Sequence, residues 1–375
     1  MNKIMRVSSV HELFRPFSKH EKRKNVLYVI NCTKFHVYEQ LLIEECLYRL
    51  SSPLSEGLNN IGFVLINNTC LNDEKKREDV GSTVSNRTNK CVVFGLSGKV
   101  QNFIKDINYV NDNKIWLIKR YTGGGTVYIN NNCLLISLIL PFNFEKEKKL
   151  YPSNITEWVF NSFYNSVFNH LDSKKKKENF LLKKFNYHEN DYVYNDYDNL
   201  CKNVFIKKVG GNAQAFSKNY FVHHTSFLWS CNYDEMEKVI INPLKQPLYR
   251  NKRNHKDFLV SLEECLPNHM NNQRTFIDTF LYNIRELINK KNNQHNDIYW
   301  YFNNIDLRIN LHEPIQPYCN IFDKVYSVDT NLLSKLYHYF CSNDQTKNLR
   351  STHLLDHRGE VLSNDCFYRP SFILT

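Results

Sequence analysis

The sequence is poor in the residues and runs that mark several classes of protein. Only 11 of its 375 residues are glycine and 10 are proline, and no stretch approaches the ~20 consecutive apolar residues that a membrane helix needs. The 11 cysteines are an odd number and form no C-x-x-C pair. Scattered single cysteines argue against a zinc ribbon and against a disulfide framework. We therefore expect an intracellular protein with reduced thiols that does not span a membrane.

The composition that remains predicts a folded, basic protein. Hydrophobic residues make up 42% and aromatic residues 14% of the chain, which is ample apolar material for a packed core. The length predicts about two domains. Lys+Arg number 49 against 38 Asp+Glu, a formal charge of +11. Such an excess indicates an acidic partner, which composition leaves open as a nucleic acid, an anionic lipid surface, a nucleotide or an acidic protein.

The first 25 residues are distinctly basic. They hold seven Lys/Arg and two acidic residues, with apolar residues between them. This pattern is typical of a mitochondrial or plastid presequence, and a disordered basic tail is the alternative. We expect residues 1–25 to be an organelle-targeting segment, with folded structure beginning at Val26. Without that segment the formal charge falls by five, to +6, which weakens the case for a nucleic-acid partner.

Hydrophobic periodicity predicts strands and amphipathic helices along the rest of the chain. The runs typical of strands are 26–30, 61–66, 91–94, 115–118, 134–140, 192–194, 204–206 and 220–229. The patterns typical of helices are 38–50, a segment within 145–184, 274–287 and 331–340. Polar stretches predict a loop over 67–90, a solvated lysine loop at 174–177 and an asparagine-rich linker over 289–296.

The sharpest local signal is a run of three glycines between two apolar strands. The segment reads Lys-Arg-Tyr-Thr-Gly-Gly-Gly-Thr-Val over residues 119–127. Consecutive glycines let a ligand approach the main chain and let N–H groups converge on an anionic oxygen. Arg120 can add a charge-assisted bond to a phosphate or carboxylate, although a plain glycine hairpin is the alternative. The run matches neither a Walker A loop nor G-x-G-x-x-G.

A second signal combines a lysine, two glycines and two histidines. Lys208 precedes Gly210 and Gly211, and His223 and His224 follow on the next strand. A lysine beside a glycine pair can be held close to a bound anion, whereas a solvated lysine is the alternative. Neighbouring side chains on a strand point to opposite faces, so both histidines cannot easily bind one metal ion. We predict no protein-held metal site here.

Four segments together resemble the lipoate-protein ligase A family, part of the biotin/lipoate A/B protein ligase fold. In order and spacing they are 119–127, 190–193, 208–214 and 223–228. Residues 37–40 and 92–95 are also similar, so the resemblance covers roughly residues 27–265. It implies an α+β fold of mixed, mainly antiparallel sheets flanked by helices, as in class II aminoacyl-tRNA synthetases. We expect this catalytic domain over residues 26–290, with residues 291–375 as a C-terminal extension.

The resemblance also implies a reaction. Lipoate attacks the α-phosphate of ATP, assisted by Mg²⁺, and the resulting lipoyl-adenylate (lipoyl-AMP) acylates a lysine of an apo lipoyl domain in a 2-oxo-acid dehydrogenase E2 subunit or the glycine-cleavage H protein. Lys208 matches the family's catalytic lysine, and Val127 and Leu135 are expected to wall a tunnel for the acyl chain. We expect a monomer, with no nucleic-acid or membrane partner. Contacts with substrate or nucleotide are implied for Arg120, Thr122, Gly123, Gly124, Gly125, Asn190, Asp191, Gly211, Asn212, Ala213 and His224.

The chain departs from the family pattern at two places. Typical ligases have a His-Asp pair after the glycines, where this chain has Ile129 and Asn130. They also have a Gly-Arg-x-Gln-Asn type segment, where residues 95–98 here read Gly-Leu-Ser-Gly. A lipoyltransferase that accepts lipoyl groups activated elsewhere is therefore an alternative.

Two other readings have less support. The octanoyltransferases of this fold need a cysteine in an Asn-Pro-Cys-Gly type segment, where Leu244 stands in this chain, and leucine cannot form a thioester. A non-catalytic nucleic-acid or protein-binding module on a degenerate ligase fold is the non-enzyme alternative. Residues 246–259 resemble a segment of one ligase-like branch, without an assigned role.

Overall fold

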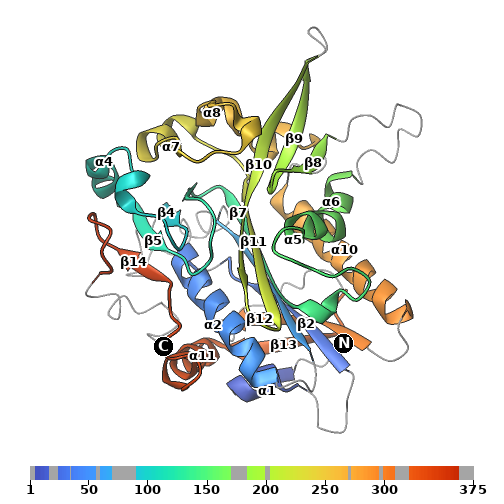
Figure 1. The fold of residues 1–375 in the computed structure, drawn as a ribbon. Coiled ribbons are helices and arrows are strands. Elements are labelled where there is room, and N and C mark those ends of the chain that lie inside the picture. Colours follow the sequence, from blue (N-terminus) through green and yellow to red (C-terminus); the bar gives the residue numbers. More distant parts are fainter. Residues whose placement is uncertain are drawn as a thin grey trace, which may run out of the picture.

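The fold is built on two β-sheets, seen in a computed structural model (Figure 1). The residues that it describes are 5–16, 24–33, 35–55, 60–69, 90–169, 184–198, 203–268, 272–294, 299–308 and 321–362. The larger sheet has ten strands in the order β1-β13-β12-β2-β3-β7-β11-β10-β9-β8, and the smaller has four in the order β14-β5-β4-β6.

The strands of the larger sheet come from nearly the whole length of the chain. They are β1 (Met5–Val7), β2 (Lys24–Asn31), β3 (Ile61–Asn68), β7 (Cys133–Pro141), β8 (Phe185–His188), β9 (Asp191–Asp198), β10 (Asn203–Phe216), β11 (Tyr220–Leu228), β12 (Tyr299–Arg308) and β13 (Lys324–Asp329). The smaller sheet contains β4 (Cys91–Phe94), β5 (Trp116–Lys119), β6 (Val127–Ile129) and β14 (His353–Leu355).

The helices vary widely in length. The long ones are α2 (Val37–Ser55), α10 (Gln273–Gln294) and α11 (Thr330–Ser342). The short ones are α1 (Val10–Phe14), α4 (Ile107–Asp112), α5 (Ile155–Val159), the π-helix η4 (Phe160–Tyr164), α6 (Asn165–Asn169), α7 (Tyr233–Val239), α8 (His255–Phe258) and α9 (Leu262–Cys265), with 3₁₀ turns η2 (Val100–Asn102), η3 (Phe142–Phe144) and η5 (Leu248–Arg250). In the described part of the chain, no helix combines the length and apolar character needed to cross a membrane.

Both sheets are mixed. From β1 to β3 the neighbours in the larger sheet run parallel, and from β3 to β8 they run antiparallel. In the smaller sheet β4 and β5 are parallel, while the other two pairs are antiparallel. The parallel pair β2–β3 is joined by α2, because parallel strands need a crossover. The predicted α+β class with mainly antiparallel sheets is confirmed.

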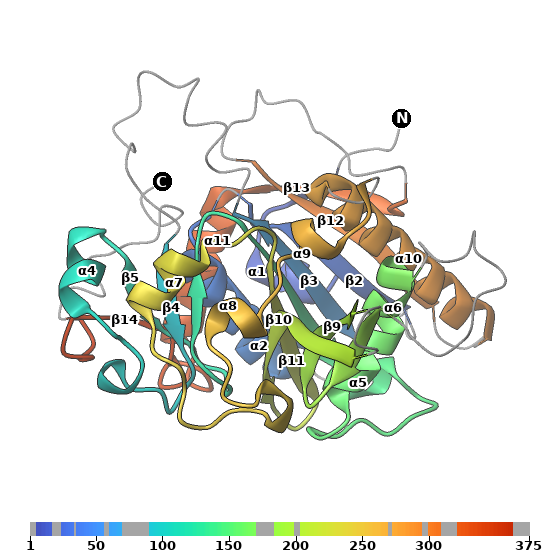
Figure 2. The same ribbon diagram turned by 90° about the horizontal axis from the view of Figure 1, so that it is seen from above.

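Helices cover both faces of the larger sheet (Figure 1). Leu27 and Val29 of β2 face a core shared with α5, α6 and α10, whereas Val26, Tyr28 and Ile30 face a core shared with α1, α2 and α11. A strand buried on both faces reads as a continuous apolar run, which is why β2 and β3 could be predicted from the sequence. The smaller sheet, with α4 and α7, lies at the end of the molecule opposite α10 (Figure 2).

Part of the N-terminal segment is folded, so the prediction that structure begins at Val26 is wrong. Strand β1 pairs in parallel with β13, and α1 buries Val10, Leu13 and Phe14. The N-cap of α1 is Ser9, whose hydroxyl accepts a hydrogen bond from Glu12 N at 3.2 Å. Interleaved basic and apolar residues are typical both of a presequence and of a short amphipathic helix packed on a core, and composition alone does not separate the two.

The C-terminal segment contributes strands to both sheets. Strands β12 and β13 lie between β2 and β1, and β14 pairs with β5. The predicted linker over 289–296 is partly wrong, because α10 continues to Gln294. The side chain of Asn292 in α10 makes two hydrogen bonds with the backbone of Trp300. It accepts from the Trp300 N–H at 2.7 Å and donates to the Trp300 carbonyl at 2.9 Å. The lysine loop at 174–177 and most of the loop predicted over 67–90 lie outside the described residues.

His223 of β11 makes folding stability depend on pH. Its ring is buried and stacks on Tyr192 with ring centroids 6.2 Å apart. Burial, and then the neighbouring His224, lower the pKa of His223 to about 3. The unfolded chain therefore binds a proton near pH 6.5 that the folded chain excludes, so this group removes stability as the pH falls below about 6.5.

We predict that the free energy of unfolding decreases by about 1.4 kcal/mol per pH unit between pH 6 and pH 4.5 through this group alone. The variant His223→Phe keeps a ring and removes the titrating nitrogens. Urea unfolding at a series of pH values should show a shallower pH slope in this variant than in the wild type. Equal slopes in the two proteins would show that His223 is protonated in the folded state.

Candidate functional site

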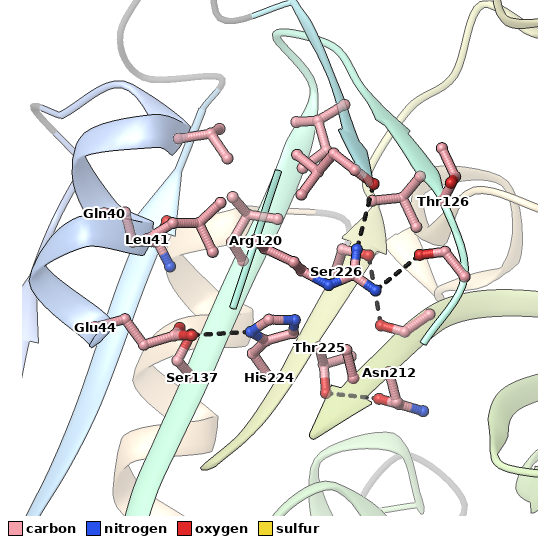
Figure 3. Close-up of a pocket in the computed structure, with 18 of the residues that line it drawn as sticks. Gln40, Leu41, Glu44, Arg120, Thr126, Ser137, Asn212, His224, Thr225 and Ser226 are labelled. Carbon is pink, nitrogen blue, oxygen red and sulfur yellow. Dashed lines mark hydrogen bonds and ion pairs between the residues drawn. The ribbon is translucent and has the colours of Figure 1, made fainter. Parts of the chain in front are cut away.

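A narrow pocket and a wide cleft meet between the two sheets. The pocket encloses about 90 Å³ and the cleft about 920 Å³. The pocket lies between α2, the glycine loop (residues 120–126), β7, β10 and β11 (Figure 3). Both cavities share the wall formed by Gly125, Thr126, Lys208, Gly211 and Asn212. A ligand can therefore occupy both cavities with its middle beside Lys208.

Arg120 holds the glycine loop from within. Its guanidinium donates from Nε to Thr122 Oγ1 at 2.9 Å, from Nη1 to the carbonyl of Val93 at 3.2 Å, and from Nη2 to the carbonyls of Gly123 and Gly125 at 2.8 and 2.7 Å. The residue is 3% exposed, and burial lowers the pKa of Arg120 to about 10. The guanidinium therefore shapes the loop, and Arg120 also lines the narrow pocket. Its contact with a substrate anion stays a prediction.

Two glycines make this loop geometrically possible. A Cβ on Gly95 would lie 2.1 Å from the carbonyl oxygen of Gly124, so only glycine lets the turn after β4 approach the loop. Gly124 itself has a φ of +93°, in the region that favours glycine. No atom lies within 4 Å of the Cβ position of Gly123 or Gly125. Gly125 lines both cavities, so its main chain faces a ligand there, whereas Gly123 lines neither.

We predict that Gly95→Ala displaces the glycine loop and destabilises the fold by about 1–3 kcal/mol, as overpacking does elsewhere. Gly123→Ala is the matched control, because its added methyl group enters open space. Urea unfolding of both variants measures the difference. Equal stability of the two variants would show that the close approach of Gly95 and Gly124 does not require glycine at position 95.

Lys208 and Asp191 form an ion pair where pocket and cleft meet. The distance from Lys208 Nζ to Asp191 Oδ1 is 2.8 Å, and the two side chains are 24% and 12% exposed. Strand β10 is irregular between Lys208 and Gly210, where its register against β9 shifts. A Cβ on Gly211 would lie 3.4 Å from Lys208 Nζ, so the glycine leaves room for the ammonium. The structure thus brings together these residues predicted for the site.

Asn190 and Asn212 both line the wide cleft and are joined by a hydrogen bond. Asn190 adopts a φ of +70° in the turn before β9, and its carbonyl accepts from Asn212 Nδ2 at 2.9 Å. Asn212 Oδ1 accepts from Thr225 Oγ1 at 2.8 Å. Ala213, the next residue on β10, is buried and lines the narrow pocket. All three residues predicted here therefore lie at one of the two cavities.

His224 belongs to a buried polar network beside the narrow pocket (Figure 3). Its Nδ1 lies 3.0 Å from Glu44 Oε1, and its Nε2 lies 3.4 Å from Thr122 Oγ1. Tyr121 donates its hydroxyl proton to the same Glu44 oxygen at 2.7 Å. Burial alone raises the pKa of Glu44, but His224 and the hydroxyls of Ser137 and Tyr121 together outweigh it, and the pKa of Glu44 lies below its usual value. His223 faces the other side of β11, as strand periodicity predicted.

Sequence reasoning missed the contribution of α2. Val37, Gln40, Leu41 and Glu44 recur at i, i+3, i+4 and i+7 and all line the pocket. The available signal was the presence of Gln40 and Glu44 on a helix face otherwise expected to be apolar. The remaining apolar lining includes Val93, Ile129 and the two predicted tunnel residues, Val127 and Leu135.

The described residues do not fit a protein-held Mg²⁺. In this part of the chain no cluster of three or more His, Cys, Asp or Glu side chains could hold a metal ion. Both oxygens of Asp191 already have partners, and Glu189 Oε2 accepts from Leu248 N at 2.7 Å. Mg²⁺ usually binds one or two carboxylates together with substrate phosphates. Such an ion would depend mainly on the phosphates of a bound nucleotide.

The two positions that depart from the ligase pattern carry no cation at the cleft. Ile129 lines both cavities with an apolar side chain. Asn130 is buried, and its Oδ1 accepts from Asn132 N at 2.9 Å. In the turn after β4, Leu96 is 52% exposed and Ser97 lines the cleft. These residues supply an apolar wall and one hydroxyl where a ligase of the usual pattern has charged or amide side chains.

The site combines an apolar pocket and a wider cleft beside a lysine and a glycine loop, and comparisons with known proteins give the family. Residues 66–284 match the lipoyl protein ligase A/B catalytic domain. The chain is 46% identical over 385 aligned residues to a Plasmodium falciparum (isolate 3D7) protein named inactive lipoate–protein ligase 2, covering 98% of this chain and 99% of the other. The chain therefore belongs to the lipoate–protein ligase family.

Solved structures of the same kind are more distant in sequence. A bipartite lipoate protein ligase from Thermoplasma acidophilum, described with its E2 lipoyl domain, is 15% identical, with a TM-score of 0.48 over 88% of this chain and 98% of that chain. P. falciparum LipL1 in complex with lipoate is 14% identical, with a TM-score of 0.45 over 74% of this chain and 66% of that chain.

Proposed function

We propose that this protein transfers a lipoyl group from lipoyl-adenylate to the ε-amine of a lysine on an apo lipoyl domain. The observation that carries the proposal is the place of Lys208, whose side chain lines both the narrow pocket and the wide cleft. The acyl–phosphate bond of lipoyl-adenylate joins an apolar acyl chain to a polar nucleotide. A lysine at the junction of an apolar pocket and a larger cleft is placed to meet that bond.

The two cavities suit the two halves of this substrate in chemical character. Val37, Leu41, Val127 and Leu135 give the narrow pocket an apolar lining suited to a hydrocarbon chain. The wide cleft contains polar groups, among them Asn190, and has room for a nucleotide. Gly125 lines both cavities, so its main-chain N–H can donate to the substrate between them. Lipoyl domains of E2 subunits and the H protein, in a mitochondrion or similar organelle, are the acceptors that we propose.

In the transfer step the acceptor amine attacks the carbonyl carbon of the mixed anhydride. A C–N bond forms, the bond between that carbon and the phosphate oxygen breaks, AMP leaves, and the proton of the attacking nitrogen passes to solvent. Negative charge develops on the carbonyl oxygen and then on the phosphate. A positioned ammonium stabilises both, and Lys208, held by Asp191, is the group that we assign to this role.

Transfer is better supported than activation of free lipoate. Activation releases pyrophosphate, whose charge needs cations or a metal ion. Arg250, which lines the cleft, donates to Asn242 Oδ1 and to the carbonyl of Arg253 instead, and Ile129 and Asn130 replace the family's His-Asp pair. The P. falciparum relative is named an inactive ligase. Loss of the activation step in both proteins agrees with that name.

The experiment that tests this function compares two donors with one acceptor. Purified protein is incubated with an apo lipoyl domain and either synthetic lipoyl-adenylate or lipoate with ATP and Mg²⁺, and the acceptor is weighed by mass spectrometry. We expect the lipoyl mass shift with lipoyl-adenylate, above the rate without protein, and little or none with lipoate and ATP. Equal modification with both donors would identify a complete ligase, and no modification with either would contradict the proposal.

A further inference from the structure

The segment from Gln246 to Leu259 packs directly on the strand that carries Lys208. Leu259 forms a parallel bridge with Lys208, and the carbonyl of Lys208 accepts from Val260 N at 3.0 Å. Arg253 Nη2 donates to the carbonyl of Ile206 on the same strand at 2.8 Å and to the carbonyl of Tyr249 at 2.9 Å. The position of Tyr249 is therefore fixed relative to Lys208.

Tyr249 contacts the partner of Lys208. Its hydroxyl donates to Asp191 Oδ2 at 2.9 Å, while Asp191 Oδ1 lies 2.8 Å from Lys208 Nζ. The ring of Tyr249 packs against His188 and Phe258, with ring centroids 5.0 and 5.2 Å away. One carboxylate thus joins an aromatic hydroxyl, held by packing, to the lysine at the junction of the two cavities.

A second hydrogen bond on Asp191 has two physical consequences. The terminal torsion of an aspartate is broad, so a donor on one oxygen restricts where the other oxygen points. Hydrogen bonds to ionised acceptors are also roughly twice as strong as neutral ones. When the ammonium of Lys208 turns from Asp191 to a substrate oxygen, the hydroxyl of Tyr249 still donates to the buried carboxylate, which lowers the cost of that turn.

We infer that Tyr249 is a positioning residue: through Asp191 it fixes the ammonium of Lys208 at the junction of pocket and cleft. Its effect on transfer rests on the proposed function, whereas its effect on Lys208 follows from the contacts themselves. The experiment must therefore read out the position of Lys208 independently of transfer.

The first measurement is the labelling rate of Lys208 by a trace of acetic anhydride, quantified by peptide mass spectrometry. In Tyr249→Phe we expect Lys208 to be labelled about threefold faster, because loss of a hydrogen bond to a charged group loosens the ion pair. Tyr233→Phe is the matched control: Tyr233 donates to Glu264 Oε1 at 2.8 Å and lines neither cavity. Its Lys208 labelling should equal that of the wild type.

The second measurement combines the change with Asp191→Asn. If Tyr249 acts through Asp191, Tyr249→Phe adds nothing to the labelling rate of Asp191→Asn, because residues acting in series are not additive. Tyr249→His, which keeps a ring and a donor, should restore part of the wild-type protection. With lipoyl-adenylate as donor, kcat should fall about tenfold in Tyr249→Phe with little change in the KM for the acceptor.

The outcomes are distinct. Unchanged labelling of Lys208 in Tyr249→Phe, or a full additional increase in the double variant, overturns the inference. If Tyr249→Phe folds poorly, the same two comparisons are made with Tyr249→Leu, which keeps an apolar side chain and lacks a donor. If the wild type transfers no lipoyl group yet the labelling results hold, the proposed function fails and the positioning of Lys208 by Tyr249 stands.

Discussion

Replacing Lys208 by alanine is expected to lower lipoyl transfer from lipoyl-adenylate about 1,000-fold, the loss that follows removal of one charge-stabilising donor in acyl transfer. The loss arises because no other ammonium lies on the wall shared by the two cavities in the described residues. The measurement is the single-turnover rate of acceptor modification, followed by mass spectrometry.

The neighbouring lysine is the control for this change. Lys207 forms an ion pair with Asp196 at 3.2 Å, and both side chains are about a third exposed or more. Surface pairs of this kind contribute little, and Lys207 lines neither cavity. Lys207→Ala should transfer within about twofold of the wild-type rate by this reasoning. A Lys208→Ala protein within tenfold of wild type, or equal losses in the two variants, would contradict the assigned role.

Replacing Arg120 by methionine is expected to abolish lipoyl-adenylate binding and to destabilise the fold by about 3–5 kcal/mol, the range for removing one partner from a buried charged cluster. The change leaves without a donor the four oxygen atoms that now accept hydrogen bonds from the guanidinium. Arg120→Lys should not restore binding, because one ammonium cannot reproduce the planar fork of donors. Urea unfolding and the Kd of a hydrolysis-resistant lipoyl-adenylate analogue measure the two effects.

Lys119, the preceding residue, supplies the matched control. Its ammonium donates to the carbonyl of Gly98 at 3.0 Å from a partly exposed position. Lys119→Met should therefore change stability by less than about 1 kcal/mol and leave the affinity for the analogue nearly unchanged. Wild-type affinity in Arg120→Met would show that the glycine loop keeps its shape without the guanidinium.

The elements with strong local periodicity could be predicted from the sequence. Strands β2, β3 and β7 are largely apolar because both of their faces are buried. The position of Lys208 beside Gly211 follows from a local motif, and the structure places both at the junction of the two cavities. Such features depend on residues close together in the sequence, so a local sequence pattern predicts them.

Features that depend on distant partners could not be predicted. The guanidinium of Arg120 also donates to the carbonyl of Val93, 27 positions away, and Tyr249 reaches Asp191 across 58 positions of sequence. Strand β12 inserts between β13 and β2 in the sheet, although it follows the catalytic motifs in the chain. None of these contacts produces a periodic pattern in the sequence, because each joins residues that become neighbours only in the folded structure.

The most direct test of the proposed site is a crystal structure of the protein with a hydrolysis-resistant lipoyl-adenylate analogue. The predicted result places the lipoyl chain in the narrow pocket against Leu41 and Leu135, the nucleotide in the wide cleft, and the ammonium of Lys208 within hydrogen-bonding distance of the carbonyl or phosphate oxygen. An acyl chain outside the narrow pocket, or a bound analogue that Lys208 does not contact, would contradict it.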